Sequence, residues 1–151
     1  MENRRSENRS FPQGSETDIN KVVEYVDRGA ENDGMVDLFR VGGYIEQIVR
    51  ANRETKPHQL RRFYDYLVGV ANRQLALPPG SGMENAIRLQ LLRMIPIADY
   101  SCNRRLLDRV YRDFISKSAE AVAKKKDQEF ARALERFRGA YEALVAFHGK
   151  E

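Results

Sequence analysis

Apolar residues recur at intervals of three and four positions along most of the chain, the spacing that lines one face of an α-helix. The last segment keeps this register at Phe130, Leu134, Phe137, Tyr141 and Leu144. No long stretch alternates apolar with polar residues, as a half-buried β-strand would. The pattern therefore predicts an all-α protein, a compact bundle of five to six helices.

Glycine, proline and capping residues divide the pattern into six helical segments. Thr55 is suited to cap the third segment, and Pro57 fits its first turn because an N–H there needs no partner. The stretch 97–104, which follows Pro96, is predicted to be a turn or a kink. The six segments cover residues 18–28, 35–52, 56–75, 83–95, 103–123 and 127–148.

Two adjacent glycines, Gly42 and Gly43, fall inside the second of these segments. Each glycine costs a helix about 1 kcal/mol relative to alanine. We therefore expect a kink at this point, or a close approach by another part of the backbone.

The chain has 151 residues, a length typical of one domain. Residues 1–16 are rich in Asn, Ser, Arg and Glu and contain a single aromatic residue. They are predicted to form a disordered N-terminal tail. Residues 17–151 are predicted to form a single helical domain.

Several classes of protein do not fit the composition. No apolar run approaches the length of a membrane-spanning helix, and the polar N-terminus lacks the apolar core of a secretory signal. The single cysteine cannot form an internal disulfide, and one Cys with two His cannot complete a structural zinc site. These features favour a cytoplasmic protein with no membrane partner, no metal and no cofactor.

Catalytic motifs are also missing from the sequence. It contains no nucleophile elbow, no zinc-protease motif and no glycine-rich phosphate loop. Cys102 stands beside Arg104 and Arg105, whose charges favour a thiolate, but a small buried residue is the simpler interpretation. We therefore expect no enzymatic activity.

Positive charge is concentrated in the middle of the chain. Residues 50–112 hold 12 basic and 5 acidic residues, a net charge of +7, whereas residues 1–49 hold 6 and 10, a net charge of −4. Eleven of the twelve central cations are arginine, which matches phosphate with a planar fork of donors and stacks on bases. The block favours a polyanionic partner, nucleic acid first. The alternative is a solvated charged face.

Five of these cations surround the start of the third segment, where the helix N-terminus itself favours anions. Two more fall in the fourth segment, and three lie at the start of the fifth. Such side chains can follow a phosphate backbone without reading its sequence. The predicted RNA contacts are Arg50, Arg53, Lys56, Arg61, Arg62, Arg88, Arg93, Arg104, Arg105 and Arg109.

Three stretches carry a resemblance to a known family. The sequence TKPHQLRRFYD at 55–65 resembles the small subunit of the type III-A CRISPR effector, the Csm complex, in which a helix opens with Thr and continues Gln-Leu/Ile-Arg-Lys/Arg-Phe-Tyr. The stretch LLRMIPIADYSCNRR at 91–105 is similar to that family's Leu-Ala-Tyr, small-small, Gly-Arg segment. The stretch FARALERFRGAYEALVAFHGK at 130–150 is similar to its closing helix.

The three stretches keep the family's order over roughly residues 50–150, two-thirds of the chain. The chain departs from the pattern at Asp99, at Asn103 where Gly is common, and at Gly149 between His148 and Lys150. Because Asn tolerates the left-handed conformation, the turn at Asn103 is expected to be kept. Residues 1–49 carry no motif of the family.

The resemblance implies a non-catalytic helical subunit, present in several copies within a ribonucleoprotein of antiviral defence. Its partners would be further copies of itself, the backbone subunits and the large polymerase-like subunit. Its basic face would line the channel in which guide RNA pairs with target RNA, base pairing supplying the sequence recognition. The matching positions that the resemblance assigns to this face are Arg61, Arg62 and Arg104.

Two other functions remain open from the residues alone. The first is a free-standing helical DNA-binding regulator, although the candidate turns are longer or richer in proline than that of a helix-turn-helix. The second is a protein-interaction bundle without nucleic acid, which would use the acidic residues 1–49 and the last helix as its working surfaces.

Overall fold

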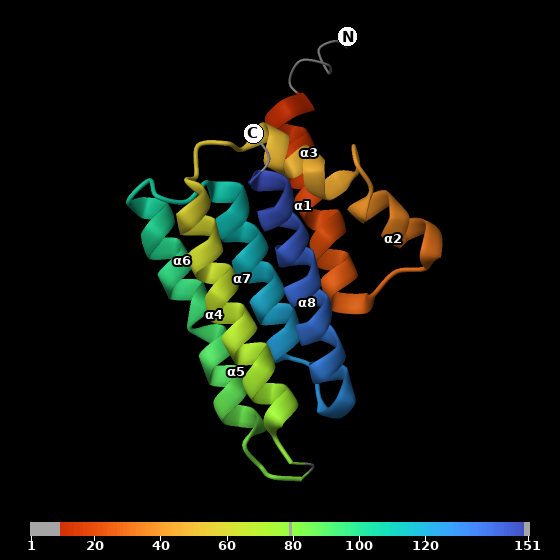
Figure 1. Ribbon diagram of the computed structural model, residues 1–151, viewed down its shortest axis with the longest axis vertical. Coiled ribbons are helices and arrows are strands. Elements are labelled where there is room, and N and C mark those ends of the chain that lie inside the picture. Colours follow the sequence, from red (N-terminus) through yellow and green to blue (C-terminus); the bar gives the residue numbers. More distant parts are fainter. Residues whose placement is uncertain (1–9, 79, 150–151) are drawn as a thin grey trace.

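Helices joined by short connections make up the structure (Figure 1). This computed structural model describes the backbone of residues 10–78 and 80–149, and the side chains of residues 18–78 and 80–149. The all-α prediction is confirmed, because no strand occurs in these ranges. The helices are α1 (Ser10–Arg28), α2 (Asn32–Phe39), α3 (Tyr44–Ala51), α4 (Pro57–Ala76), α5 (Glu84–Leu92), α6 (Met94–Asn103), α7 (Arg109–Ala123) and α8 (Asp127–His148).

The first helix begins earlier than its sequence pattern predicted. Helix α1 starts at Ser10 rather than near Asp18, so residues 10–16, which we expected in a disordered tail, are helical. The rest of that expected tail, residues 1–9, lies outside the described residues.

The glycine pair divides the second predicted segment into α2 and α3. Gly42 has a φ of +81°, which L side chains rarely adopt, and a Cβ at Gly43 would collide with the carbonyl oxygen of Asp37. The backbone N–H of Gly42 donates to Glu46 Oε1 at 2.7 Å, so a carboxylate in the first turn of α3 satisfies a donor just ahead of the helix. The expected close backbone approach is therefore present.

The prediction of a turn or a kink at 97–104 is wrong, because α6 continues through this stretch to Asn103. Pro96 is the third residue of α6, where the missing N–H has no intrahelical partner to lose. Arg93, between α5 and α6, also has helical backbone angles (φ −64°, ψ −19°). The two helices therefore follow one another with little interruption.

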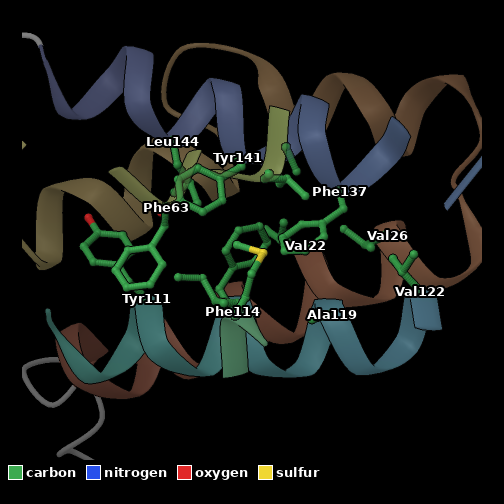
Figure 2. Packing of buried hydrophobic residues seen from close by; sticks show 14 of the residues in the cluster. Val22, Val26, Phe63, Tyr111, Phe114, Ala119, Val122, Phe137, Tyr141 and Leu144 are labelled. Atoms are coloured by element: carbon green, nitrogen blue, oxygen red, sulfur yellow. The ribbon is translucent and has the colours of Figure 1, made fainter. Parts of the chain in front are cut away.

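The helices pack around one apolar core, whose side chains come from elements far apart in the sequence (Figure 2). Helix α8 presents the predicted register to this core, and all five of its apolar residues are buried. Phe114 of α7 lies edge-on to Phe137 and Tyr141 of α8, with ring centroids 5.5 and 5.8 Å apart. Edge-to-face packing of this kind adds to the burial energy of each ring.

Each large buried tyrosine satisfies its hydroxyl with a backbone carbonyl. Tyr141 donates to the carbonyl of Leu60 at 2.8 Å, and Tyr111 donates to that of Asn52 at 2.9 Å. Burial raises the pKa of the Tyr141 phenol well above its usual value, and the neighbouring Tyr111 adds to the effect. Both phenols therefore act as hydrogen-bond donors across the physiological pH range.

Helices α2, α5 and α6 lie at the periphery of the bundle (Figure 1). Helices α5 and α6 pack inward on α4 and α7, and α2 contacts only α3 and α1 among the main helix pairs.

The α1 C-terminus is held by Arg136 of α8, whose Nε donates to the carbonyl of Val26 at 3.0 Å. Lys125 pairs with Asp27 and, chiefly through their hydrogen bond, lowers the pKa of that carboxyl.

Candidate nucleic-acid interface

A reciprocal set of hydrogen bonds joins Thr55, just before α4, to Asp108, just before α7. The Asp108 carboxylate accepts from the Thr55 backbone N–H at 3.1 Å and from its hydroxyl at 2.9 Å. The same hydroxyl accepts from the Asp108 backbone N–H at 2.7 Å. Thr55 is only 2% exposed, so water does not compete for these bonds, and the two helix starts are held together.

This arrangement corrects the predicted role of Thr55. The residue that caps α4 is Lys56, whose side chain makes no capping hydrogen bond. Thr55 instead uses its hydroxyl to hold a segment 53 positions away.

A second bond reinforces the same junction. The Tyr111 hydroxyl of α7 donates to the carbonyl of Asn52, in the segment that leads to α4. Burial raises the pKa of Tyr111, and the carboxylate of Asp108 raises it further, whereas the charge of Arg53 lowers it. Arg53 therefore acts electrostatically on a residue of α7 although it belongs to the segment before α4.

Five of the predicted RNA contacts lie in the two segments that the Thr55–Asp108 link joins. All five are exposed, and each lies within four positions of Thr55 or Asp108. We call this set the basic rim; it consists of Arg53, Lys56, Arg104, Arg105 and Arg109.

Arg61 and Arg62 extend the basic rim along the first turns of α4. Both are exposed, and the guanidinium of Arg62 lies 5.6 Å from the ring centroid of Phe63. Leu60 and Phe63 beside them are buried, so the apolar positions of the QLRRFY motif anchor the helix while its two arginines face solvent.

Arg104 and Arg105 follow the end of α6, and they differ in their contacts and in their backbone conformation. Arg104 donates to the Tyr100 hydroxyl at 2.8 Å and lies 5.5 Å from the centre of that ring. Arg105 has a φ of +63°, in the left-handed region. We expected the left-handed residue of this turn to be Asn103, but Asn103 is the last residue of α6. The left-handed residue therefore lies two positions later than the family pattern indicates.

Arg50 and Arg93 lie outside the basic rim. Arg50, at the end of α3, pairs with the buried carboxylate of Glu46 at 3.7 Å. Arg93 lies between α5 and α6, about 16 Å along the helix axis from Arg104 at 1.5 Å per residue. The structure therefore does not group Arg93 with the other predicted contacts.

Arg88 is a correction to the prediction. Its Nε donates to the carbonyl of Ala123 at 3.1 Å, and its two terminal nitrogens bind the carbonyl of Lys125 and the side chain of Asn85. Its guanidinium also lies 4.5 Å from the ring centroid of Phe130. With its donors used to cap the end of α7, Arg88 holds the bundle together and is removed from the proposed interface.

The groups considered for catalysis remain separate. His58 is exposed in the first turn of α4, whereas His148 is buried with its ring 6.1 Å from that of Tyr111. Cys102 is half-buried rather than fully buried. Over residues 18–78 and 80–149, no three His, Cys, Asp or Glu side chains are grouped to bind a metal. None of the helices in these ranges is long and apolar enough to cross a membrane.

Residues that position the basic rim were missed by the sequence reasoning. They are Asp108 and Tyr111, which hold the 52–56 segment. No local pattern connects either residue with the 52–56 segment, because the partners are 53 and 59 positions apart.

The fold and this surface define a class of protein: a small all-α protein with a cluster of exposed basic side chains around the starts of α4 and α7. A family model described as Csm2 Type III-A matches residues 35–151. The chain belongs to this family, and it is therefore a small subunit of the type III-A CRISPR effector, the Csm complex. No curated protein and no solved structure matches the chain. The match begins within α2 and includes α3 to α8, and it confirms the resemblance seen in the three sequence stretches.

Proposed function

We propose that this protein is a non-catalytic subunit that binds the phosphate backbone of guide RNA and target RNA through the basic rim, Arg61 and Arg62. In this role it supports assembly of the Csm complex in the cytoplasm during antiviral defence. Its partners are the RNA, the backbone and polymerase-like subunits, and further copies of itself. The observation that carries the proposal is the Thr55–Asp108 link, which gathers cations from two separate segments.

Physical chemistry supports a backbone-binding role for such a surface. Arginine binds phosphate through paired donors and keeps its charge at every physiological pH. Holding several arginines on a buried scaffold lowers the entropy lost when they meet a regular array of phosphates. Contacts of this type position the RNA, and base pairing within the guide–target duplex supplies specificity.

The direct test reverses the charges of Arg61 and Arg62 in the assembled complex. The double variant Arg61→Glu/Arg62→Glu is expected to weaken RNA retention and to reduce the slope of log affinity against log salt by about 1 to 2, because each phosphate contact contributes about 0.7–0.9. Retention is measured by filter binding of the purified complex at several salt concentrations.

A matched control carries the same change of net charge elsewhere. Arg28→Glu/Arg132→Glu reverses two exposed arginines on α1 and α8 and is expected to leave RNA retention near that of the unaltered complex. Circular dichroism establishes that both variants keep their helices. Equal loss of RNA in both variants, or in neither, would mean that the assigned face is wrong.

An affinity pull-down of the tagged protein from its native cell separates this proposal from the other two functions. Several partner proteins together with short RNAs of a few discrete lengths are expected. A specific duplex-DNA footprint would support the regulator instead. Partner proteins without RNA, and binding that ignores salt, would support the interaction bundle.

A further inference from the structure

Large apolar side chains that remain exposed fall into two groups on the described surface. Seven of the nine belong to the part of the chain from the end of α4 to the connection after α6; they are Leu75, Met83, Leu89, Leu92, Ile97, Tyr100 and Leu106. The other two, Val36 and Val41, belong to α2 and the turn after it. Where large exposed apolar side chains adjoin one another, they mark a candidate interaction site.

The first group is centred on the outer face of α5 and α6. We call Leu89, Leu92, Ile97 and Tyr100 the α5–α6 stripe. Because Arg93 is itself helical, the two helices form a nearly continuous run. At 3.6 residues per turn the four residues fall within about 140° of one another around its axis, so they share one broad side. Helices α5 and α6 bury their other side against α4 and α7. Tyr100 is 60% exposed and Leu89 is 54% exposed.

The charges that accompany the α5–α6 stripe are positive. Arg93 and Arg104 are exposed on the same side of the helices. The one acid of α6, Asp99, is engaged by Arg112 of α7 at 3.4 Å and by Asn103 at 3.4 Å. A fitting partner therefore offers apolar side chains together with carboxylates.

The second group, Val36 and Val41, is accompanied by negative rather than positive charge. Val36 is 57% exposed and Val41 is 70% exposed. Three exposed carboxylates accompany them, those of Glu31, Asp33 and Asp37. Arg40, the one cation of this stretch, pairs with Asp37 at 3.7 Å, so the stretch keeps a net negative charge. Figure 1 shows α2 extending from the bundle on the side opposite to α5 and α6.

We propose that α2 of one copy docks on the α5–α6 stripe of the next copy, with Val36 and Val41 against the apolar side chains and Asp33 and Asp37 facing Arg93. The two surfaces lie on opposite sides of the molecule, so the contact is head-to-tail and leaves both outer surfaces of a pair unoccupied. Such a contact extends a row of copies instead of closing a dimer. The occurrence of several copies rests on the proposed function; the choice of faces rests on the apolar and charged residues described above.

The small size of α2 determines how tightly two copies are expected to bind each other. A helix of eight residues presents a small contact area, so isolated chains are expected to associate weakly, and copies held side by side in a complex gain from effective concentration. Opposite charges around the apolar contact fix its orientation and disfavour contacts between two α2 helices.

Cysteine crosslinking captures weak contacts and reports which faces meet. Chains carrying Val36→Cys and chains carrying Ile97→Cys, each with Cys102→Ala, are mixed at high concentration and mildly oxidised. A covalent dimer is expected from the mixture, and a ladder of multiples from a chain carrying both cysteines. The matched control replaces Ile97→Cys by Glu142→Cys on α8, whose side chain is 59% exposed, and no dimer is expected.

Charge exchange tests the same pairing without a covalent bond. Asp37→Arg is expected to weaken self-association at least about tenfold in sedimentation experiments, because like charges across an interface cost more than 1.4 kcal/mol, the equivalent of one factor of ten. Mixing Asp37→Arg chains with Arg93→Glu chains is expected to restore the association. RNA retention by Asp37→Arg is measured in parallel and is expected to be unchanged, which keeps this test distinct from that of the RNA-binding face.

Three results would overturn the proposal. The first is the absence of the Val36–Ile97 crosslink, or its formation at the same level with the α8 control. The second is association that Asp37→Arg leaves intact. The third is an Ile97→Asp variant that loses a different subunit from the purified complex while self-association persists, since the α5–α6 stripe would then belong to that subunit.

Discussion

At the scale of single residues, Arg105 combines an unfavourable backbone with an exposed charge. Its φ of +63° is one of two positive values at non-glycine positions in the described chain. The left-handed conformation costs an L-residue about 1–2 kcal/mol. Because this strained backbone lowers stability, the exposed cation of Arg105, next to the Thr55–Asp108 link, is better explained by a role for its charge than by a role in stability.

Two substitutions at Arg105 separate these contributions. Arg105→Gly is expected to raise the free energy of unfolding by about 1 kcal/mol, because glycine adopts a positive φ without strain. Arg105→Ala removes the same charge but keeps the strain, so no such gain is expected. Thermal unfolding measures the difference, expected at about 2–4 °C.

Both Arg105 variants are expected to lower RNA retention to the same extent, since both lose the charge. A larger loss of RNA with Arg105→Ala than with Arg105→Gly would show that backbone geometry, and not charge, governs the effect.

At the scale of elements, two glycines in helical regions have opposite surroundings. A Cβ at Gly43, the N-cap of α3, would meet carbonyl oxygens of Asp37, Leu38 and Arg40. A Cβ at Gly139, in the middle of α8, would meet nothing within 4 Å. The first glycine is required by the turn between α2 and α3, whereas the second only weakens its helix.

Matched alanine substitutions test this contrast. Gly43→Ala is expected to lower the free energy of unfolding by about 1–3 kcal/mol through overpacking against the backbone. Gly139→Ala is expected to raise it by about 0.5–1 kcal/mol. Urea unfolding of the isolated protein measures both values. Stabilisation by Gly43→Ala would contradict the close approach of the two chain segments.

The same scale explains which helices were predicted well. Helix α8 occupies residues 127–148 as predicted, because its apolar spacing is uninterrupted and Gly149 follows it. Helix α6 was missed because Pro96 was taken as an interruption. A proline in a first turn is tolerated, and only the position of the α5–α6 joint decides whether Pro96 lies in a first turn.

At the scale of the whole molecule, the Thr55–Asp108 link joins segments that precede two different long helices. These bonds are partly buried, and the side chain of each partner accepts from the backbone N–H of the other. Losing the Thr55 hydroxyl therefore leaves the Asp108 backbone N–H without its acceptor and removes one of the two hydrogen bonds to the Asp108 carboxylate.

Thr55→Val tests the link while keeping the shape of the side chain. It is expected to lower the free energy of unfolding by about 1–3 kcal/mol, since the buried hydroxyl is removed and its two hydrogen bonds are lost. RNA retention is expected to fall as well, because the basic rim loses its common support. Chemical unfolding and filter binding measure the two effects.

Thr55→Ser is the control, since it retains the hydroxyl, and it is expected to keep most of both properties. If Thr55→Val lowered stability but left RNA retention at the level of Thr55→Ser, the link would support the fold alone.

The candidate site was predictable only in part. The arginines of the basic rim could be proposed as contacts because charge is visible in the sequence. Arg88 was misplaced because its partners, the carbonyls of Ala123 and Lys125, are 35 and 37 positions away. The acidic character of α2 was also visible, but its position opposite the α5–α6 stripe was not.

The sequence by itself determined the all-α class, the limits of α4 and α8 and the family, because helical periodicity and short motifs depend on residues within a few positions of one another. The tertiary structure alone decided which arginines form one surface, which arginine supports the core, and which apolar residues stay exposed. Those outcomes depend on hydrogen bonds and packing between segments that come together only when the helices assemble.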